Sequence, residues 1–321
     1  MRRPVVALLY VVLVGAASVA RAQADLPGAR ALGMGEAMRT DATGAEGPLL
    51  NPAGMSMIRQ YAIEADYGFN VEQLGHNVNV SVVDSITSRV AAGLFYSYIY
   101  ATPRLGFNWA GGQVDSAQIT RTGHAAGLSL SVPLGDSFIL GATAKYLHFD
   151  TTAPLPSGTM PSHLTLDTVN GVTFDVGLLV RLGNKFRIAA VGYNLWDHGS
   201  RESPLSLGLG VGFSPIESLT INFDSVINFT GYQNYKIDAM TGKITLDSRV
   251  TARFGPGLEW LIAGKVPIRA GVVYDSGLPA TFLSLGLGYV SPSFAIDLGY
   301  RTKVQGGIEN FLMLGLRLFV N

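Results

Sequence analysis

The residues that could do chemistry in this chain do not fall into catalytic or metal-binding patterns. The chain has no cysteine, which excludes disulfides, thiolate metal ligands and cysteine nucleophiles. It has no GxSxG nucleophile motif and no Walker A loop. The histidines contain neither an HExxH motif nor a pair at i and i+4, and they lie at His76, His124, His148, His163 and His198. We therefore predict that the protein is not an enzyme and holds no metal and no cofactor.

Two catalytic alternatives are left by the pattern of glycines and of scattered polar residues. The run Gly208-Leu-Gly-Val-Gly212 superficially resembles a phosphate-binding loop. However, its glycines alternate with Leu207, Leu209, Val211 and Phe213, which is typical of a strand whose glycines share one face. A hydrolase whose Asp, His and Ser side chains meet only in the fold stays open, and no motif supports it.

Composition and charge narrow the class further. The chain carries 23 basic and 23 acidic residues, so its formal net charge is zero and gives no argument for a nucleic-acid partner. Only 14% of the residues are charged and 48% are hydrophobic, whereas a soluble domain has about 25% charged residues. Something other than ionic groups must therefore cover the surface.

The elements that position these residues are strands, because apolar and polar residues alternate with a period of two along most of the chain. Most of these segments have the roughly 9–11 residues that cross a bilayer at a strong tilt, and their even number suits a bacterial barrel. The fourteen candidate strands are 60–70, 74–84, 87–100, 121–134, 137–149, 170–182, 185–197, 204–214, 217–230, 247–263, 265–275, 280–291, 293–303 and 309–320.

The connections between these strands alternate in length. Tight turns such as Gly135-Asp136 and Gly183-Asn184 follow every second strand, whereas 101–120, 150–169 and 231–246 are long. Outer-membrane barrels have short periplasmic turns and longer extracellular loops. We therefore predict an all-β fold, a 14-stranded antiparallel transmembrane β-barrel over residues 60–321. It would lie among lipids of the outer membrane of a Gram-negative bacterium, inserted by the barrel-assembly machinery.

Charged residues within the predicted strands must face the lumen. An arginine or lysine on the lipid face near the middle of the bilayer would cost about 2–4 kcal/mol. These residues could line a permeation path or simply neutralise one another. The predicted lumen-facing residues are Glu64, Asp66, Lys145, Asp175, Arg181, Asp224, Arg253, Glu259, Arg269, Asp297, Arg301 and Arg317.

Gly255-Pro256-Gly257 interrupts the tenth predicted strand. Proline cannot donate to a β-ladder, so a bulge or a local break is expected. The break either bends the wall or forms a lateral opening for an apolar ligand.

The N-terminal residues precede the strands and divide into two parts. Residues 1–24 have the positive, apolar and small-residue regions of a cleaved signal peptide, which implies export. Residues 25–59 lack strand alternation, and we expect them to form short helices or turns inside or beneath the barrel. Asn51, Pro52, Ala53 and Gly54 have the chemistry of a tight turn within this segment.

The segment Ala29-Arg-Ala-Leu-Gly-Met-Gly35, followed by Asp41-Ala42 and Asn51-Pro-Ala-Gly54, resembles the N-terminal signature of the FadL-like outer-membrane proteins. That family includes long-chain fatty acid transporters and the PorV/PorQ group associated with type IX secretion. The resemblance implies fourteen strands and an N-terminal hatch in the lumen, with the Asn-Pro-Ala-Gly turn at its centre.

The resemblance favours a channel for passive uptake of small hydrophobic, fatty-acid-like molecules, gated by the hatch. The alternative is a PorV-like scaffold or shuttle whose partners are secreted proteins. A general diffusion porin is disfavoured by the predicted hatch.

Overall fold

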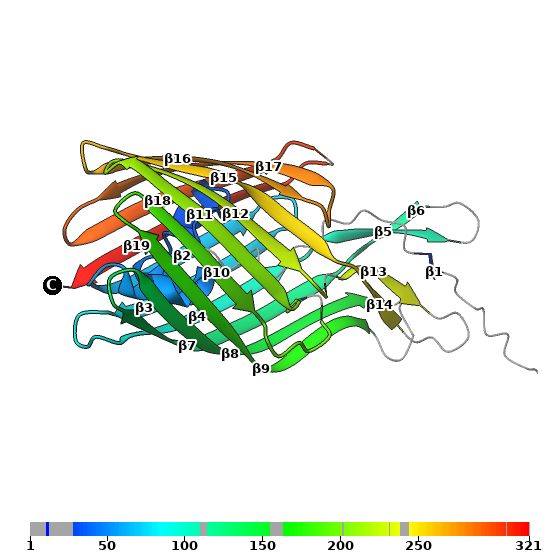
Figure 1. Cartoon of the computed structure of the whole chain (residues 1–321). Helices are drawn as coiled ribbons and strands as arrows, with labels where there is room; N and C mark the ends of the chain where they lie inside the picture. Colours follow the sequence, from blue (N-terminus) through cyan, green and yellow to red (C-terminus); the bar gives the residue numbers. More distant parts are fainter. Residues whose placement is uncertain are drawn as a thin grey trace, which may run out of the picture.

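Fourteen antiparallel strands form a closed barrel in the computed structural model, which describes residues 11–12, 28–109, 114–154, 163–200, 202–230, 232–237, 244–305 and 307–320. Each strand pairs with its neighbour in chain order, and β19 pairs with β2 to close the wall (Figure 1). The barrel strands are β2 (Tyr61–Asn70), β3 (Gly75–Asp84), β4 (Ala91–Ala101), β7 (Thr120–Leu134), β8 (Phe138–Pro154), β9 (His163–Leu182), β10 (Phe186–Tyr193), β11 (Ser206–Ile216), β12 (Leu219–Asn228), β15 (Thr251–Ile262), β16 (Val266–Asp275), β17 (Ala280–Val290), β18 (Phe294–Lys303) and β19 (Asn310–Val320).

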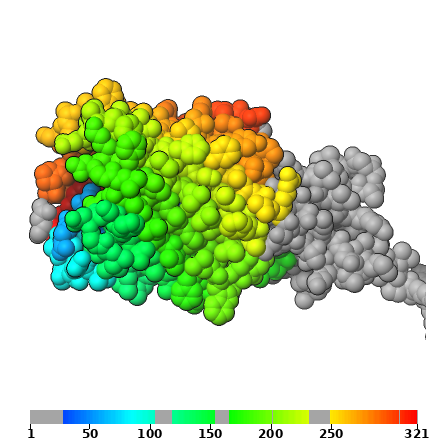
Figure 2. All heavy atoms as spheres, viewed as in Figure 1, coloured from blue at the N-terminus to red at the C-terminus, as the bar shows by residue number. Residues whose placement is uncertain are grey.

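Burial alternates along these strands as the sequence pattern predicts. In β2, for example, Glu64 and Asp66 are buried and face the lumen, whereas Tyr67 is 49% exposed on the outer face. Closure pairs the backbone groups of every barrel strand with two neighbours, which is the condition for a sheet in hydrocarbon. Figure 2 shows one side of this wall as a continuous surface. The prediction of a 14-stranded antiparallel barrel is confirmed.

The two rims of the barrel differ. Short connections lie at one rim, the turn end, where residues 135–137 join β7 to β8. The opposite rim, the loop end, carries two hairpins that extend beyond the barrel in Figure 1. They are β5 (Arg104–Trp109) with β6 (Val114–Gln118), and β13 (Tyr232–Ile237) with β14 (Ile244–Ser248). β1 (Val11–Val12), within the predicted signal peptide, pairs with β5.

The long connections contain more strand than the sequence pattern indicates. β8 and β9 stay paired beyond the predicted limits, out to Pro154 opposite His163. β10 is shorter than predicted because it ends at Tyr193, where Asn194 adopts a positive φ of 51°. Cross-strand pairing sustains the extension of β8 and β9 beyond the predicted limits.

The segment 28–59, here called the lumenal segment, lies inside the barrel and appears in blue in Figure 1. It consists of α1 (Ala29–Gly33), η2 (Gly44–Glu46), α2 (Gly47–Leu50) and η3 (Pro52–Ser56). α1 contacts β16 to β19, and η3 contacts β7, β8 and β9, so the segment crosses the lumen from one wall to the other. No helix within the described residues is long and apolar enough to cross a membrane.

Candidate functional site: the lumen and its N-terminal segment

The start of the lumenal segment is anchored by a carboxylate of the wall. Asp66, on β2, accepts a hydrogen bond from the backbone N–H of Ala29 at 3.0 Å. The amides at a helix start have no partner within the helix, and a carboxylate can satisfy one of them. Asp66 is therefore a contact point for α1 and faces the lumen.

A second wall carboxylate holds the chain after α1. One oxygen of Asp224, on β12, accepts the backbone N–H groups of Met38 at 2.9 Å and of Arg39 at 2.8 Å. The same oxygen lies 3.0 Å from Nη1 of Arg39, whose Nε donates to the hydroxyl of Tyr193 at 2.8 Å. Tyr193 in turn donates to the carbonyl of Leu50. This chain of contacts joins two wall strands to two points of the lumenal segment.

The Asn51-Pro52-Ala53-Gly54 turn sits against the wall near the turn end. Asn51 is fully buried, and its Oδ1 accepts the N–H of Ala53 at 3.1 Å, which caps η3. Its Nδ2 donates to the carbonyl of Arg39 at 2.9 Å, which ties the two halves of the lumenal segment together. Ser131 of β7 donates to the carbonyl of Ala53 at 3.1 Å.

Two wall glycines make this close approach possible. A Cβ on Gly141 would lie 2.3 Å from the backbone N of Ala53, and a Cβ on Gly177 would lie 2.2 Å from Oδ1 of Asn51. Both distances are shorter than any real contact, so only glycine fits while η3 keeps its position.

Ion pairs connect the lumenal segment to the opposite wall. Arg30 contacts Glu46 at 3.2 Å within the segment and Glu259 of β15 at 3.0 Å. The network then continues across β16, β18, β19 and β2 by the contacts Glu259–Arg269 (2.6 Å), Arg269–Asp297 (2.6 Å), Asp297–Arg317 (3.7 Å) and Arg317–Glu64 (3.1 Å). The predicted lumen-facing charges of these strands thus neutralise one another around Arg30.

A second network lies around Glu36. Its carboxylate contacts Arg253 at 3.0 Å and Arg301 at 2.8 Å. Arg253 also lies 3.5 Å from Asp275, and Arg301 lies 3.8 Å from Glu309. Glu36 is thus the link between the lumenal segment and wall strands β15 and β18.

The remaining predicted lumen residues lie apart from these networks. Lys145 contacts Asp175 at 2.7 Å, and the other oxygen of Asp175 accepts the N–H of Asn194 at 2.8 Å. Arg181 lies next to the last residue of β9, at the turn end, where its guanidinium donates to the carbonyl of Asp136. Arg181 therefore serves the rim and not the centre of the lumen.

Several charged residues of the lumen were not predicted from the sequence. The charged residues of the lumenal segment itself, Arg30, Glu36, Arg39, Asp41 and Glu46, complete both networks and the Asp41–Arg187 pair at 2.9 Å. The sequence feature that could have identified them is that these charged residues occur in a segment otherwise rich in small and apolar residues. A buried ion pair, Arg121–Glu202 at 2.8 Å, had no signal, because Glu202 lies in the connection between β10 and β11.

The ladder between β15 and β16 is interrupted at the predicted position. β15 pairs with β16 at Phe254–Tyr274 and again at Gly257–Gly271, and the positions between them, Gly255 and Pro256, are skipped. A Cβ on Gly255 would lie 1.7 Å from the carbonyl oxygen of Val272, so the two backbones are in close contact. The ladder is interrupted as proline requires. The close approach at Gly255 favours a bend of the wall, and the lateral opening stays a prediction.

One side of the lumen wall is apolar. Buried side chains of β4, β7, β8 and β9 pack together there, and Leu49 of the lumenal segment packs against them. We call this cluster the apolar strip; it consists of Phe95, Ile99, Ala125, Leu147, Phe149 and Val169. Arg121 and Thr151 pair two residues further toward the loop end, and both contact Glu202. The apolar strip thus lies between the lumenal segment and the β10–β11 connection.

Metal chemistry has no site in the described part of the chain, since no group of three or more His, Asp or Glu side chains there could hold a metal ion.

Several solved structures have a fold similar to that of this barrel. The toluene transporter TbuX of Ralstonia pickettii superimposes with a TM-score of 0.70 at 14% identity, covering 92% of this chain and 99% of that chain. A Pseudomonas aeruginosa FadL homologue gives a TM-score of 0.67 at 14% identity, covering 91% and 98%. The chain has the FadL-like barrel fold.

A third FadL-like barrel, the CymD monoaromatic hydrocarbon channel, gives a TM-score of 0.65 at 16% identity, covering 91% of this chain and 96% of that chain. No protein-family model and no curated protein matches the sequence. At these identities the FadL-like assignment concerns the fold alone.

Proposed function

We propose that this FadL-like barrel is an outer-membrane channel for the passive passage of small hydrophobic molecules, with the lumenal segment as its gate. The observation that carries the proposal is the apolar strip, which lies on the lumenal face of the same wall that carries the ion pairs. The six buried apolar side chains of the strip offer a hydrophobic molecule a surface inside the lumen. Contact with this surface removes the molecule from water, which is favourable.

The position of the lumenal segment supports a gate. Leu49 packs on the apolar strip, so the segment covers the path along it in this closed structure. Its other contacts combine apolar packing, such as Leu32 with Phe311 and Ala53 with Ile139, with ion pairs and hydrogen bonds to wall side chains. The solvation lost by a buried ion pair offsets much of its Coulombic gain, so hydration of the lumen can replace the ion pairs at modest net cost.

The solved structures with this fold give independent support. TbuX is a toluene transporter, and CymD is a monoaromatic hydrocarbon channel. Aromatic hydrocarbons and fatty-acid-like molecules are both hydrophobic, and we include both in the proposed substrate class. The predicted signal peptide, residues 1–24, and the FadL-like fold support export to the outer membrane of a Gram-negative bacterium.

A substitution in the apolar strip tests the function. Phe149→Gln keeps a large side chain but adds an amide, so apolar molecules lose contact and meet a polar group that must be desolvated. We expect uptake of radiolabelled toluene and oleate by cells expressing the variant to fall by about fivefold or more, which corresponds to about 1 kcal/mol. If only one of the two probes is affected, the substrate class is narrowed to that probe.

Phe282→Gln is the matched control, because Phe282 is a similarly buried lumenal phenylalanine on β17, outside the apolar strip. Its uptake is expected to match the unmodified protein. Equal uptake by the Phe149 variant and the unmodified protein, at equal amounts of folded barrel, would rule out the apolar strip as the path.

A further inference from the structure

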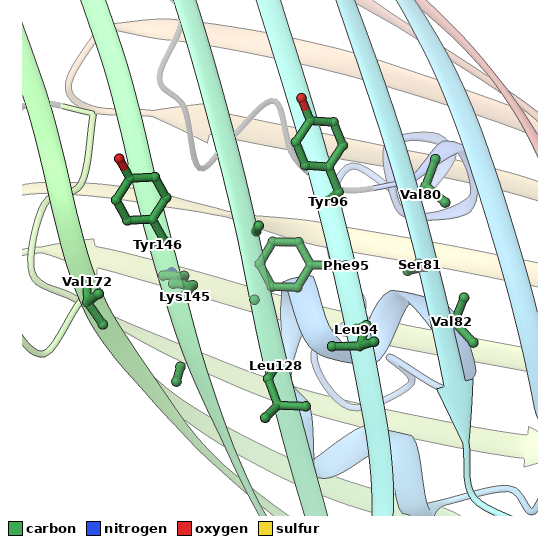
Figure 3. A pocket seen from close by; sticks show the side chains of 13 residues that line it. Val80, Ser81, Val82, Leu94, Phe95, Tyr96, Leu128, Lys145, Tyr146 and Val172 are labelled. Carbon is green, nitrogen blue, oxygen red and sulfur yellow. The ribbon is translucent and has the colours of Figure 1, made fainter.

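The lipid-facing surface of the barrel carries an apolar groove. It has a volume of about 610 Å³ and lies over β3, β4, β7, β8 and β9 (Figure 3). Its outward-facing walls are Val80, Val82, Leu94, Leu128 and Val172, with Tyr96 and Tyr146 at one end.

The groove is a depression in the outer surface because two small side chains lie between larger ones. Ala126 pairs with Tyr96 on one side and with Tyr146 on the other, and Ala144 pairs with Leu128. On the lumenal side, a Cβ on Gly127 would lie 2.3 Å from the ring of Phe95, so that ring rests directly on the backbone. Pairing of β7 with β4 and β8 continues without a shift past these residues, so the feature is a groove and not a hole.

Polar groups begin where the groove ends toward the loop end. The hydroxyl of Tyr96 lies 2.7 Å from Nδ1 of His124, and the hydroxyl of Tyr146 donates to Asn170 at 2.6 Å. Figure 3 shows the hydroxyls of Tyr96 and Tyr146 pointing in the same direction. His148 lies beside His124, with ring centroids 6.3 Å apart, and its Nε2 is 3.3 Å from Asp150.

We call His124, His148, Asp150 and Asn170 the polar belt. These side chains offer hydroxyl-matching donors and acceptors. The belt contains no lysine or arginine, the residues that usually hold a phosphate. Aromatic and amphipathic residues at this level mark the boundary between acyl chains and headgroups in a membrane barrel.

We propose that the groove and the polar belt together form a binding site for one glycolipid of the surrounding outer leaflet. An acyl chain fills the groove over Ala126 and Ala144, and an uncharged sugar headgroup hydrogen-bonds to the polar belt. The groove is continuous with the belt through Tyr96 and Tyr146, so one molecule with an apolar tail and a hydroxyl-rich head occupies both. This site is on the outside of the wall and is independent of passage through the lumen.

Native mass spectrometry of the purified barrel in a sugar-free oligo-oxyethylene detergent tests this site. The probes are monoglucosyldiacylglycerol and a phosphatidylglycerol with the same acyl chains. The unmodified barrel is expected to bind the glycolipid at least tenfold more tightly than the phospholipid. Ala126→Phe with Ala144→Phe fills the groove and is expected to reduce glycolipid binding at least tenfold.

Two further variants keep the test specific. Ala270→Phe places the same side chain on the lipid face of β16, outside the groove, and is expected to leave binding unchanged. His124→Ala keeps the groove but removes part of the polar belt, so the preference for the sugar headgroup is expected to shrink.

The groove would not be the binding site if the double variant bound the glycolipid as tightly as the unmodified barrel. The same conclusion would follow if Ala270→Phe reduced binding as much as the double variant does. Equal binding of both lipids by the unmodified barrel would overturn the glycolipid as its occupant. If the double variant does not fold, Ala144→Leu is the substitute, and the same comparison with Ala270→Leu decides.

Discussion

At the scale of single residues, wall side chains hold the lumenal segment through its backbone. Asp66 and Asp224 accept main-chain N–H groups, and Ser81 donates to the carbonyl of Ala45 at 2.8 Å. Hydrogen bonds that involve a charged group contribute about 1.5–3 kcal/mol each when both partners are buried. A few such residues can therefore set the position of a segment that has little regular structure of its own.

Asn51 makes the sharpest prediction at this scale. Asn51→Ala with Pro52→Ala removes the cap of η3, the bond to the Arg39 carbonyl and the rigid φ of proline. We expect the lumenal segment to loosen and the single-channel conductance in planar bilayers to rise above that of the unmodified barrel.

A cysteine reporter supplies a second measurement, since the chain has no cysteine of its own. Met38→Cys is fully buried in the closed state and should react with a water-soluble maleimide faster when combined with the Asn51 and Pro52 substitutions. Asn184→Ala, in an exposed turn, is the control. Unchanged conductance together with unchanged labelling would reduce the motif to an ordinary turn.

At the scale of elements, the wall strands combine two demands. They must alternate apolar and polar residues to face lipid and lumen, and they must carry glycine where the lumenal segment touches them. A Cβ on Gly271 would lie 2.3 Å from the carbonyl carbon of Met34, and a Cβ on Gly257 would lie 2.3 Å from the oxygen of the same residue. Glycine weakens a strand interior, so these positions sacrifice some strand stability for contact with α1.

Pro256 belongs to this scale because it interrupts a ladder. The backbones of β15 and β16 touch at Gly255, so we expect Pro256→Val to leave uptake of toluene and oleate unchanged. The added N–H can complete the pairing with β16, and the variant should unfold at the same or a slightly higher temperature. Uptake in expressing cells and thermal unfolding in detergent measure the two effects. A marked fall in uptake by this variant would support a lateral opening in the wall at Pro256.

At the scale of the whole molecule, closure is the source of stability. The fourteen barrel strands are each paired on both sides, so opening the barrel in a membrane would expose unpaired backbone groups at several kcal/mol each. We expect the protein in dodecyl sulfate to migrate differently on gels before and after boiling, because the unboiled barrel stays folded. Identical migration of heated and unheated samples would contradict a closed barrel in the purified protein.

The sequence by itself determined the number of barrel strands, the parity of their connections and the face on which each charge lies. Side chains of a strand alternate between two faces, and a charge on the face toward lipid costs several kcal/mol. The alternation therefore fixes which face of each strand points to lipid and which points to the lumen. For the same reason Glu64, Asp66 and Asp224 could be assigned to the lumen before any contact was known. The strand limits beyond the membrane were less predictable, since water accepts either face there.

Only the tertiary structure decided which groups meet inside. Arg30 contacts Glu259 across 229 positions of the sequence, and Glu202 reaches Arg121 from a connection with no pattern of its own. The apolar strip likewise combines four strands whose inward residues carry no local signal of being neighbours. Alternation specifies a face, whereas closure, register and the path of the lumenal segment specify the partner, and those depend on the whole chain.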